Sequence, residues 1–237
     1  MEFVLVVPRR DLFADCYPQG FQPFGDGLSV AQLERAVREH GFFVERRHAE
    51  RDHDLKQIIP YTIVTRRTTS ERGGDAGEWQ VLLLRRLAKG GEKRLHDKLS
   101  IGVGGHIDAD DARTLADGEL ARVLDLGTQR ELHEELVLTE EPTLRRVGLL
   151  NDDSNPVGAV HLGLVQVARV EGPVAIREAD VLEGRFEPLP ALSALRASGA
   201  DFETWSAHLV ENLADLVQDS GSPRGQRREP TGAGATT

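Results

Sequence analysis

The stretch Arg130-Glu131-Leu132-His133-Glu134-Glu135 is the densest chemical signal in the sequence. In a helix its three glutamates are related by i, i+3 and i+4, so three carboxylates crowd one face and repel one another. Carboxylate oxygens are the ligands that hard divalent ions such as Mg²⁺ or Mn²⁺ prefer. The alternative is an ordinary solvated glutamate-rich face, and these six residues taken alone favour it.

The sequence around this stretch predicts strands gathered about one long helix. A glycine-rich segment, Ser100-Ile101-Gly102-Val103-Gly104-Gly105-His106-Ile107-Asp108, precedes the helix. Apolar periodicity predicts strands at 3–7, 57–65, 79–87, 144–150 and 157–170, and helices at 28–40, 117–138, 191–197 and 202–218. A glycine-rich turn at 71–77 makes the second and third of these strands a predicted hairpin.

Together these segments resemble the Nudix hydrolases, whose signature is G-x5-E-x7-R-E-U-x-E-E-x-G-U with U aliphatic. The second half of the signature is matched in register by Arg130, Glu131, Leu132, Glu134, Glu135 and Leu138, and Gly105 resembles the opening glycine. The resemblance covers about 57–190. It implies a Nudix α/β/α sandwich with a mixed sheet, and a hydrolase that needs Mg²⁺ or Mn²⁺.

The first half of the signature departs from the family spacing by eleven inserted residues. If Glu119 is the first glutamate, thirteen residues separate it from Gly105 and ten separate it from Arg130, where the family has five and seven. A continuous helix would hold Glu119 and Arg130 about 16 Å apart, too far to pair. The other reading breaks the helix at Gly127. We expect the insertion at 109–118 to be a solvent-exposed extension that rims the site.

The late glycine of the signature is replaced by Val137. A β-branched residue resists the positive φ that a glycine adopts in a turn, so the helix is expected to end differently from the family pattern.

The resemblance also implies roles for individual residues. Arg130 and Glu131 are the predicted catalytic residues, and Glu131 is also a predicted metal ligand. The remaining predicted metal ligands are Glu134, Glu135 and a backbone carbonyl of Gly104 or Gly105. A further carboxylate from a later loop is expected from Glu178, Glu183 or Glu187, with Glu183 ranked first.

Four residues are predicted to contact substrate. Arg85 and Arg86 suit phosphates, although alternation along a strand lets only one of them face the site. His106 is favoured over His161 because of its neighbours in the glycine-rich segment. Asp152 lies in a polar turn at 151–156, for which a plain Asx turn and a substrate or metal contact are equally favoured.

Composition excludes several classes of partner. The formal net charge is −10, which argues against a nucleic-acid backbone or an anionic membrane as the main partner. The single cysteine, Cys16, forms no internal disulfide, and no signal peptide is evident, so a cytoplasmic protein is expected. A homodimer is left open.

Four regions are predicted along the chain. They are a strand and helix extension at 1–56, the Nudix domain at 57–190, a helical segment at 191–219 and a disordered tail at 220–237.

The predicted function is hydrolysis of a phosphoanhydride in a nucleoside diphosphate linked to another moiety. Two alternatives remain: a ligand sensor without catalysis, and a prenyl-diphosphate isomerase, which would need a cysteine in the pocket. No phosphate-binding loop of the kinase type and no dinucleotide fingerprint is present.

Overall fold

The computed structural model describes residues 1–13, 17–25, 28–68, 77–87, 97–177 and 179–218. Predictions about the tail, Cys16, Glu178 and most of the 71–77 turn therefore concern residues outside this range.

The strands are β1 (Phe3–Pro8), β2 (Gly20–Pro23), β3 (Phe42–Glu45), β4 (Leu55–Arg67), β5 (Trp79–Arg86), β6 (Leu99–Ser100), β7 (Val103–Gly104), β8 (Leu136–Leu138), β9 (Thr143–Asn151), β10 (His161–Arg169), β11 (Val174–Ile176) and β12 (Leu182–Pro188). The α-helices are α1 (Arg9–Leu12), α2 (Val30–His40), α3 (Arg46–Ala49), α4 (Val123–Glu135), α5 (Leu189–Ala197), α6 (Thr204–Val210) and α7 (Leu213–Gln218). The 3₁₀ turns are η2 (Ala109–Ala112), η3 (Leu120–Arg122) and η4 (Gly158–Val160).

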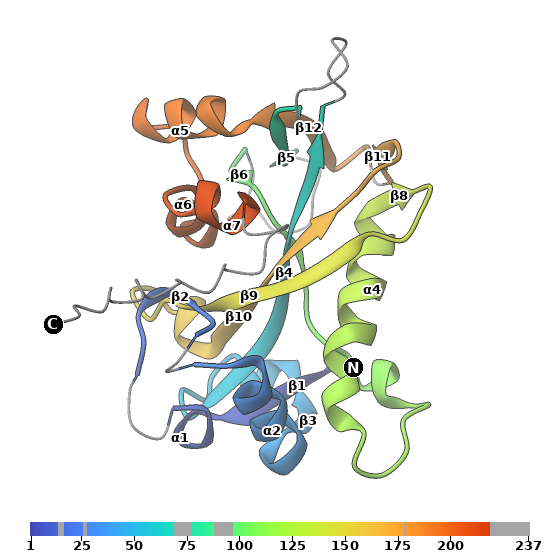
Figure 1. Cartoon of the computed structure of the whole chain (residues 1–237). Helices are drawn as coiled ribbons and strands as arrows, with labels where there is room; N and C mark the ends of the chain where they lie inside the picture. Colours follow the sequence, from blue (N-terminus) through green and yellow to red (C-terminus); the bar gives the residue numbers. More distant parts are fainter. Residues whose placement is uncertain (14–16, 26–27, 69–76, 88–96, 178, 219–237) are drawn as a thin grey trace, which may run out of the picture.

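The long strand β4 forms the centre of a mixed sheet. β10 pairs with β4 in parallel, and β5 pairs with β4 antiparallel, as the predicted hairpin requires. The main path of the sheet runs β12-β5-β4-β10-β9-β2, and β1 joins through β4 and carries β3 at its own edge (Figure 1). Strands of residues 1–56 thus belong to the same sheet as those of 57–190.

Helices cover both faces of this sheet, and strand alternation decides which residues meet them. On β10, Leu162 and Leu164 pack in the core with α2 and α4, while Val165 and Val167 pack in the core with α5, α6 and α7. Figure 1 shows α4 on one side of the sheet and the C-terminal helices on the other. This arrangement confirms the predicted α/β/α sandwich.

The central helix is shorter than the sequence predicts. Gly118 has φ +85°, a left-handed conformation that interrupts a helix, and α4 begins only at Val123. Within α4 the helix runs unbroken through Gly127, and the Thr128 hydroxyl donates to the Leu124 carbonyl at 2.6 Å as an ordinary helical residue does. The continuous helix is therefore confirmed over α4, and the break at Gly127 is wrong.

Two further contacts fix where α4 lies. The Gln166 amide on β10 donates to the Thr128 hydroxyl at 2.8 Å, which ties the helix to the sheet. A Cβ at Gly127 would press on Ile107, so this glycine lets the helix approach the segment after β7 closely. At its other end α4 stops at Glu135, and Val137 continues as an extended residue of β8 opposite Ala175, which confirms the expected change at the helix exit.

The predicted helix at 202–218 is two helices, because the chain turns at Asn212. The Asn212 amide side chain donates to the His208 carbonyl at 3.0 Å, and its backbone N–H donates to Leu209 three residues back. Asparagine competes for backbone carbonyls in this way and weakens helix interiors. Trp205 on α6 packs edge-on against Tyr61 with ring centroids 5.5 Å apart, as expected of a residue that docks this segment on the sheet.

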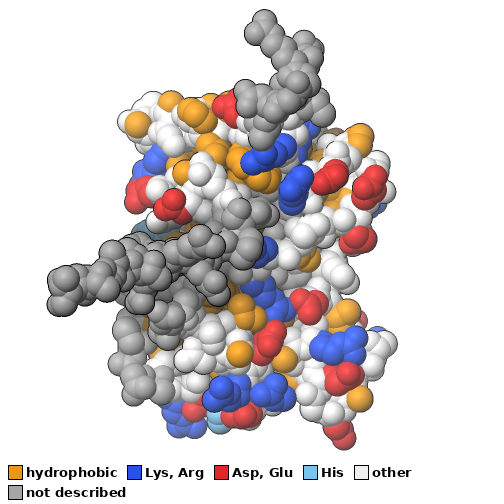
Figure 2. All heavy atoms as spheres, viewed as in Figure 1, with side chains coloured by type: hydrophobic (Ala, Val, Ile, Leu, Met, Phe, Trp, Pro, Cys, Tyr) orange, Lys and Arg blue, Asp and Glu red, His pale blue; other side chains and the backbone are white. Residues whose placement is uncertain are grey.

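The surface mixes both signs of charge despite the net charge of −10. In the face shown in Figure 2, Asp and Glu side chains are interspersed with Lys and Arg over its lower and right-hand parts. None of the helices in the described part of the chain is long and apolar enough to span a bilayer.

Candidate functional site

Arg130 lies at the centre of a group of acidic residues on α4 and the segment before it. Its Nε and Nη2 donate to the two Asp111 carboxylate oxygens at 3.0 and 3.2 Å, and Nη2 also donates to the His106 carbonyl at 2.6 Å. Nη1 donates to Glu131 at 2.8 Å and to Glu134 at 3.1 Å. The Arg130 cluster is defined here as Arg130, Asp108, Asp111, Glu131 and Glu134.

Asp111 is the residue that the sequence analysis missed. Five residues separate Gly105 from Asp111, so an aspartate stands where the family signature has its first glutamate. Its side chain makes the bidentate contact with Arg130, and 7% of that side chain is exposed. Glu119, the residue first considered for this role, is instead on the surface and pairs with Arg122 at 2.8 Å.

The eleven extra residues therefore follow Asp111 and are residues 112–122. Ala112, Leu115 and Leu120 of this stretch pack against the core that contains α2, while its other residues are mostly exposed. The expectation that 109–118 is a solvent-exposed extension is thus wrong in part, because Ala112 and Leu115 pack against the core.

The Glu131 carboxylate lies against the backbone of Gly105. A Cβ added at Gly105 would overlap that carboxylate, so any other residue there would displace Glu131 from its present position. Burial raises the pKa of Glu131, although Arg130 acts in the opposite direction. This close approach brings an α4 carboxylate beside the backbone of the glycine-rich segment.

Asp108 adds a fourth carboxylate that no sequence argument singled out. Its Oδ2 is 4.0 Å from Arg130 Nη2, and its Oδ1 is buried without a hydrogen-bond partner among the described residues. Burial raises the pKa of Asp108. With all groups ionised, the Arg130 cluster holds four carboxylates and one guanidinium, a formal charge of −3.

This charge and these donors suit a hard cation. Among the described residues, no three His, Cys, Asp or Glu side chains are arranged as a formed metal site. The composition of the Arg130 cluster nevertheless fits Mg²⁺ or Mn²⁺, because the available donors are oxygens, carboxylates outnumber the cation, and Asp108 has a buried oxygen to offer.

The adjacent arginines of β5 point to opposite faces of the sheet. Arg86 Nη2 lies 3.2 Å from Glu135 Oε1, so Arg86 faces α4. Arg85 Nη2 lies 2.8 Å from Glu183 Oε2, and Glu183 is directly opposite Arg85 on β12. The structure therefore brings Arg86 together with the α4 glutamates and does not bring Arg85 or Glu183 to them.

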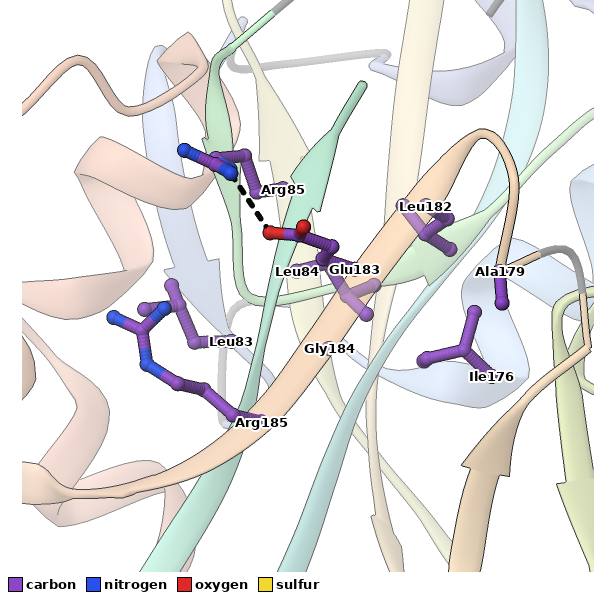
Figure 3. A pocket seen from close by; sticks show the side chains of 9 residues that line it. All are labelled: Leu83, Leu84, Arg85, Ile176, Ala179, Leu182, Glu183, Gly184 and Arg185. Atoms are coloured by element: carbon purple, nitrogen blue, oxygen red, sulfur yellow. Dashed lines mark hydrogen bonds and ion pairs between the residues drawn. The ribbon is translucent and has the colours of Figure 1, made fainter. Parts of the chain in front are cut away.

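Arg85 and Glu183 instead border a shallow hollow of about 370 Å³ on β5 and β12. Figure 3 shows the ion pair between them and the aliphatic side chains of Leu182 and Ile176 on the far side of the hollow. Arg185 contributes a second guanidinium to its lining. No glutamate of α4 lines this hollow.

Two of the predicted substrate contacts are already engaged elsewhere. The His106 imidazole lies 3.2 Å from that of His161, and burial, with further effects from Arg46 and His161, lowers the pKa of His106 to about 3. The Asp152 carboxylate accepts from the Ser154 backbone N–H at 3.0 Å and from the Asn155 side chain at 3.2 Å, which is the geometry of an Asx turn.

Comparison with known proteins places this chain among others of similar length. No protein-family model matches it. It is 36% identical over 220 residues to Protein YmaB of Bacillus subtilis (strain 168), a match that covers 90% of this chain and 97% of that protein.

Solved structures are similar as well. Tm1382, designated a Nudix hydrolase, is 28% identical with a TM-score of 0.70, and the match covers 91% of this chain and 100% of that one. A NUDIX hydrolase from Alicyclobacillus acidocaldarius is 13% identical with a TM-score of 0.51, over 68% and 91% of the two chains, which shows the fold alone.

Proposed function

Because this chain belongs to the Nudix hydrolase family and is an enzyme of the Nudix pyrophosphohydrolase class, we propose that it hydrolyses a phosphoanhydride with the help of Mg²⁺ or Mn²⁺. The proposed substrate is a nucleoside diphosphate linked to another moiety. The observation that carries the proposal is the Arg130 cluster, in which four carboxylates surround a single guanidinium.

In this proposal the metal is held by Glu131, Glu134 and Glu135 of α4 together with a backbone carbonyl of Gly104 or Gly105. When bound, such an ion neutralises the diphosphate, lowers the pKa of a bound water and stabilises the leaving oxygen. The close approach of Glu131 to Gly105 supports this ligand set, because it puts carboxylate and glycine backbone side by side.

The remaining residues orient these ligands. Arg130 spans Glu131 and Glu134 with one nitrogen, which keeps both carboxylates on the same side of the helix despite their repulsion. Asp111 holds the other edge of the guanidinium through two hydrogen bonds, so the first acidic position of the signature acts by fixing Arg130.

Arg86 is the favoured phosphate contact. It lies against Glu135 on the α4 face, and a guanidinium has donors enough to bind a phosphate with two charge-assisted hydrogen bonds while it keeps its carboxylate partner. Arg85, on the other face with Glu183, is the weaker candidate. His106 and Asp152 remain predictions as substrate contacts, and each would have to give up a present partner.

The experiment is a screen of the full-length protein against nucleoside diphosphates joined to sugars, nucleosides and alkyl groups, with Mg²⁺, Mn²⁺ or chelator. We expect metal-dependent release of a mononucleotide. Glu134→Gln and Glu135→Gln keep side-chain shape and remove a ligand charge, so each should lower the rate about 1,000-fold, a loss of roughly 4 kcal/mol.

The matched control is Glu140→Gln, a change at an exposed glutamate in the turn between β8 and β9, which should hydrolyse at the wild-type rate. If the wild type binds a nucleoside diphosphate and metal but releases no product across the panel, the sensor alternative is correct. If the two α4 variants are as fast as wild type, the proposed site is wrong.

A further inference from the structure

Two histidines far apart in sequence meet beside the glycine-rich segment. His106 Nε2 and His161 Nε2 are 3.2 Å apart, and His161 Nδ1 is 2.6 Å from the Val157 carbonyl oxygen. A carbonyl only accepts, so the His161 proton is on Nδ1 and its Nε2 carries the lone pair. His106 Nε2 is therefore the donor of the bond that joins the two rings.

The side chain of His106 and the side chains of its two neighbours face opposite ways. Its neighbours Gly105 and Ile107 face α4, since a Cβ at Gly105 would meet Glu131 and Ile107 packs beneath Gly127. In an extended chain the side chain between them points the other way. The His106 ring thus faces away from α4 toward His161, while its carbonyl accepts from Arg130 at 2.6 Å.

Among the described residues, this segment has a gap in its backbone pairing to neighbouring strands at the same place. The pairing of β7 with β4 ends at Gly104, opposite Tyr61. The next residue of β4 in that direction is Pro60, which has no N–H to continue the ladder. Backbone pairing to a neighbouring strand resumes only where the Leu5 N–H donates to the Ile107 carbonyl at 2.9 Å.

A metal bound between the rings is the competing interpretation. Two imidazole nitrogens at this separation would suit one ion, but no third His, Cys, Asp or Glu joins them among the described residues. Glu2 Oε1 is 3.7 Å from the other nitrogen, Nδ1 of His106, and is held there by Arg46. The contact between the rings is therefore a hydrogen bond that connects β10 to the glycine-rich segment.

We propose that His161 is a positioning residue of this hydrolase: by accepting from His106, it holds residues 105–106 where their backbone meets Glu131 and Arg130. The inference rests on the proposed function for its effect on turnover. His161 does not touch the carboxylates of the Arg130 cluster in this account, and it acts only through the placement of the segment.

The test compares three variants of the full chain. His161→Leu removes the acceptor, His161→Gln keeps an acceptor near the position of Nε2, and Val165→Ala is the control because it weakens the same strand in the core behind it. We expect His161→Leu to lower kcat about 10-fold to 30-fold with KM changed less than two-fold. His161→Gln should recover most of that loss, and Val165→Ala should keep the wild-type kcat below its own melting temperature.

A second measurement needs no activity. Amide hydrogen exchange without added metal should become faster in the peptide that contains residues 103–108 in His161→Leu, and not in Val165→Ala. If exchange is unchanged in His161→Leu, His161 does not hold residues 105–106 in place, even if the wild type is an active hydrolase. If the wild type hydrolyses nothing, the proposed function is wrong, and with it the role of His161 in turnover. The exchange result still decides whether His161 holds residues 105–106 in place.

Discussion

The Arg130 cluster contains more acidic than basic groups, whereas a second polar cluster, around Lys56, contains more basic than acidic groups. The Lys56 cluster is defined as Arg9, Tyr17, Lys56 and Asp153. Lys56 is fully buried, and its ammonium donates to Asp153 at 2.7 Å and to the Gly158 carbonyl at 3.0 Å. Arg9 pairs with the same carboxylate, so one acid meets two cations here, whereas four acids meet one cation around Arg130.

The difference separates a structural device from a binding device. The acceptors of Lys56 are all supplied by the protein, and the Arg9 guanidinium also stacks on Tyr17 at 4.1 Å. The Arg130 cluster keeps an uncompensated negative charge and a buried carboxylate oxygen with no partner among the described residues, whereas the unpartnered buried atom of the Lys56 cluster is a donor, Arg9 Nε. The Arg130 cluster therefore gains from an added cation, and the Lys56 cluster does not.

The largest expected effect on stability comes from breaking the Lys56 cluster. Asp153→Ala leaves the buried Lys56 ammonium without its only carboxylate partner among the described residues, and removing one member of a buried pair costs about 3 kcal/mol of the free energy of unfolding. Chemical denaturation measures it. Asp110→Ala removes an exposed carboxylate paired with Arg113 and should cost less than about 0.5 kcal/mol. Equal costs for the two variants would contradict the structural role of Asp153.

The pH dependence of this cluster follows from the same pair. Burial raises the pKa of Asp153, but the hydrogen bond and charge of Lys56, together with Tyr17 and Arg9, outweigh burial, and the net pKa lies below the usual 3.8. A lowered carboxyl pKa gives stability that is present above pH 3.8 and is lost as the pH falls through the folded-state pKa. The difference in stability between wild type and Asp153→Asn should therefore be constant near neutral pH and shrink below about pH 3.8.

Added metal should distinguish the two clusters. Mg²⁺ or Mn²⁺ at 100 times its Kd should raise the free energy of unfolding of the wild type by about 2.7 kcal/mol, and chelator should reverse the change. Asp153→Ala should show the same increment from its lower starting point, since its site is intact. Glu131→Gln should lose most of it. A full increment in Glu131→Gln would remove Glu131 from the ligand set.

The close approach of the Glu131 carboxylate to Gly105 allows a finer test of the Arg130 cluster. Gly105→Ala puts a methyl group where the Glu131 carboxylate lies, and this flexible side chain can move aside. We expect the metal-dependent rate to fall about 30-fold, or roughly 2 kcal/mol, with a change in stability below 1 kcal/mol. Gly25→Ala, at a glycine with open space around it, should leave the rate unchanged. A wild-type rate in Gly105→Ala would show that the close approach has no part in turnover.

The sequence predicts the Arg130 cluster better than the Lys56 cluster for a physical reason. Glu131, Glu134 and Arg130 are neighbours on one helix, so spacing alone puts them on one face. The Lys56 cluster joins residues 9, 17, 56 and 153, and only the sheet brings them together. No local sequence pattern predicts such a contact.

Within the Arg130 cluster, distance along the sequence also explains why Glu119 was considered for the first acidic position of the signature in place of Asp111. Counting backward from Arg130 over seven residues ends on the last residue of the insertion, Arg122, whereas counting forward from Gly105 stops before the insertion, at Asp111. The contact between Asp111 and Arg130 spans 19 positions and depends on how the insertion packs. Strands β1, β4, β5, β9 and β10 and the longer helices were predictable from apolar periodicity, apart from breaks such as Gly118 and Asn212 that depend on single backbone or side-chain contacts. Strands β2, β3 and β12 of the same sheet were not predicted, because their place in it depends on pairing with distant segments.

The smallest expected effect is that of Glu134→Gln on stability without metal. Glu134 is 56% exposed and bonds to Arg130, which favours folding by a few tenths of a kcal/mol for an exposed i, i+4 pair. Its charge also adds to the repulsion among the carboxylates of the Arg130 cluster, which opposes folding by a similar amount. We therefore expect the free energy of unfolding in chelator to change by less than about 0.5 kcal/mol in either direction. The same variant should lose the stabilisation by Mg²⁺ or Mn²⁺. A loss of 2 kcal/mol or more in chelator, measured by denaturant titration, would mean that Glu134 is needed for the fold, and that the negative charge around Arg130 is structural, as the charges around Lys56 are.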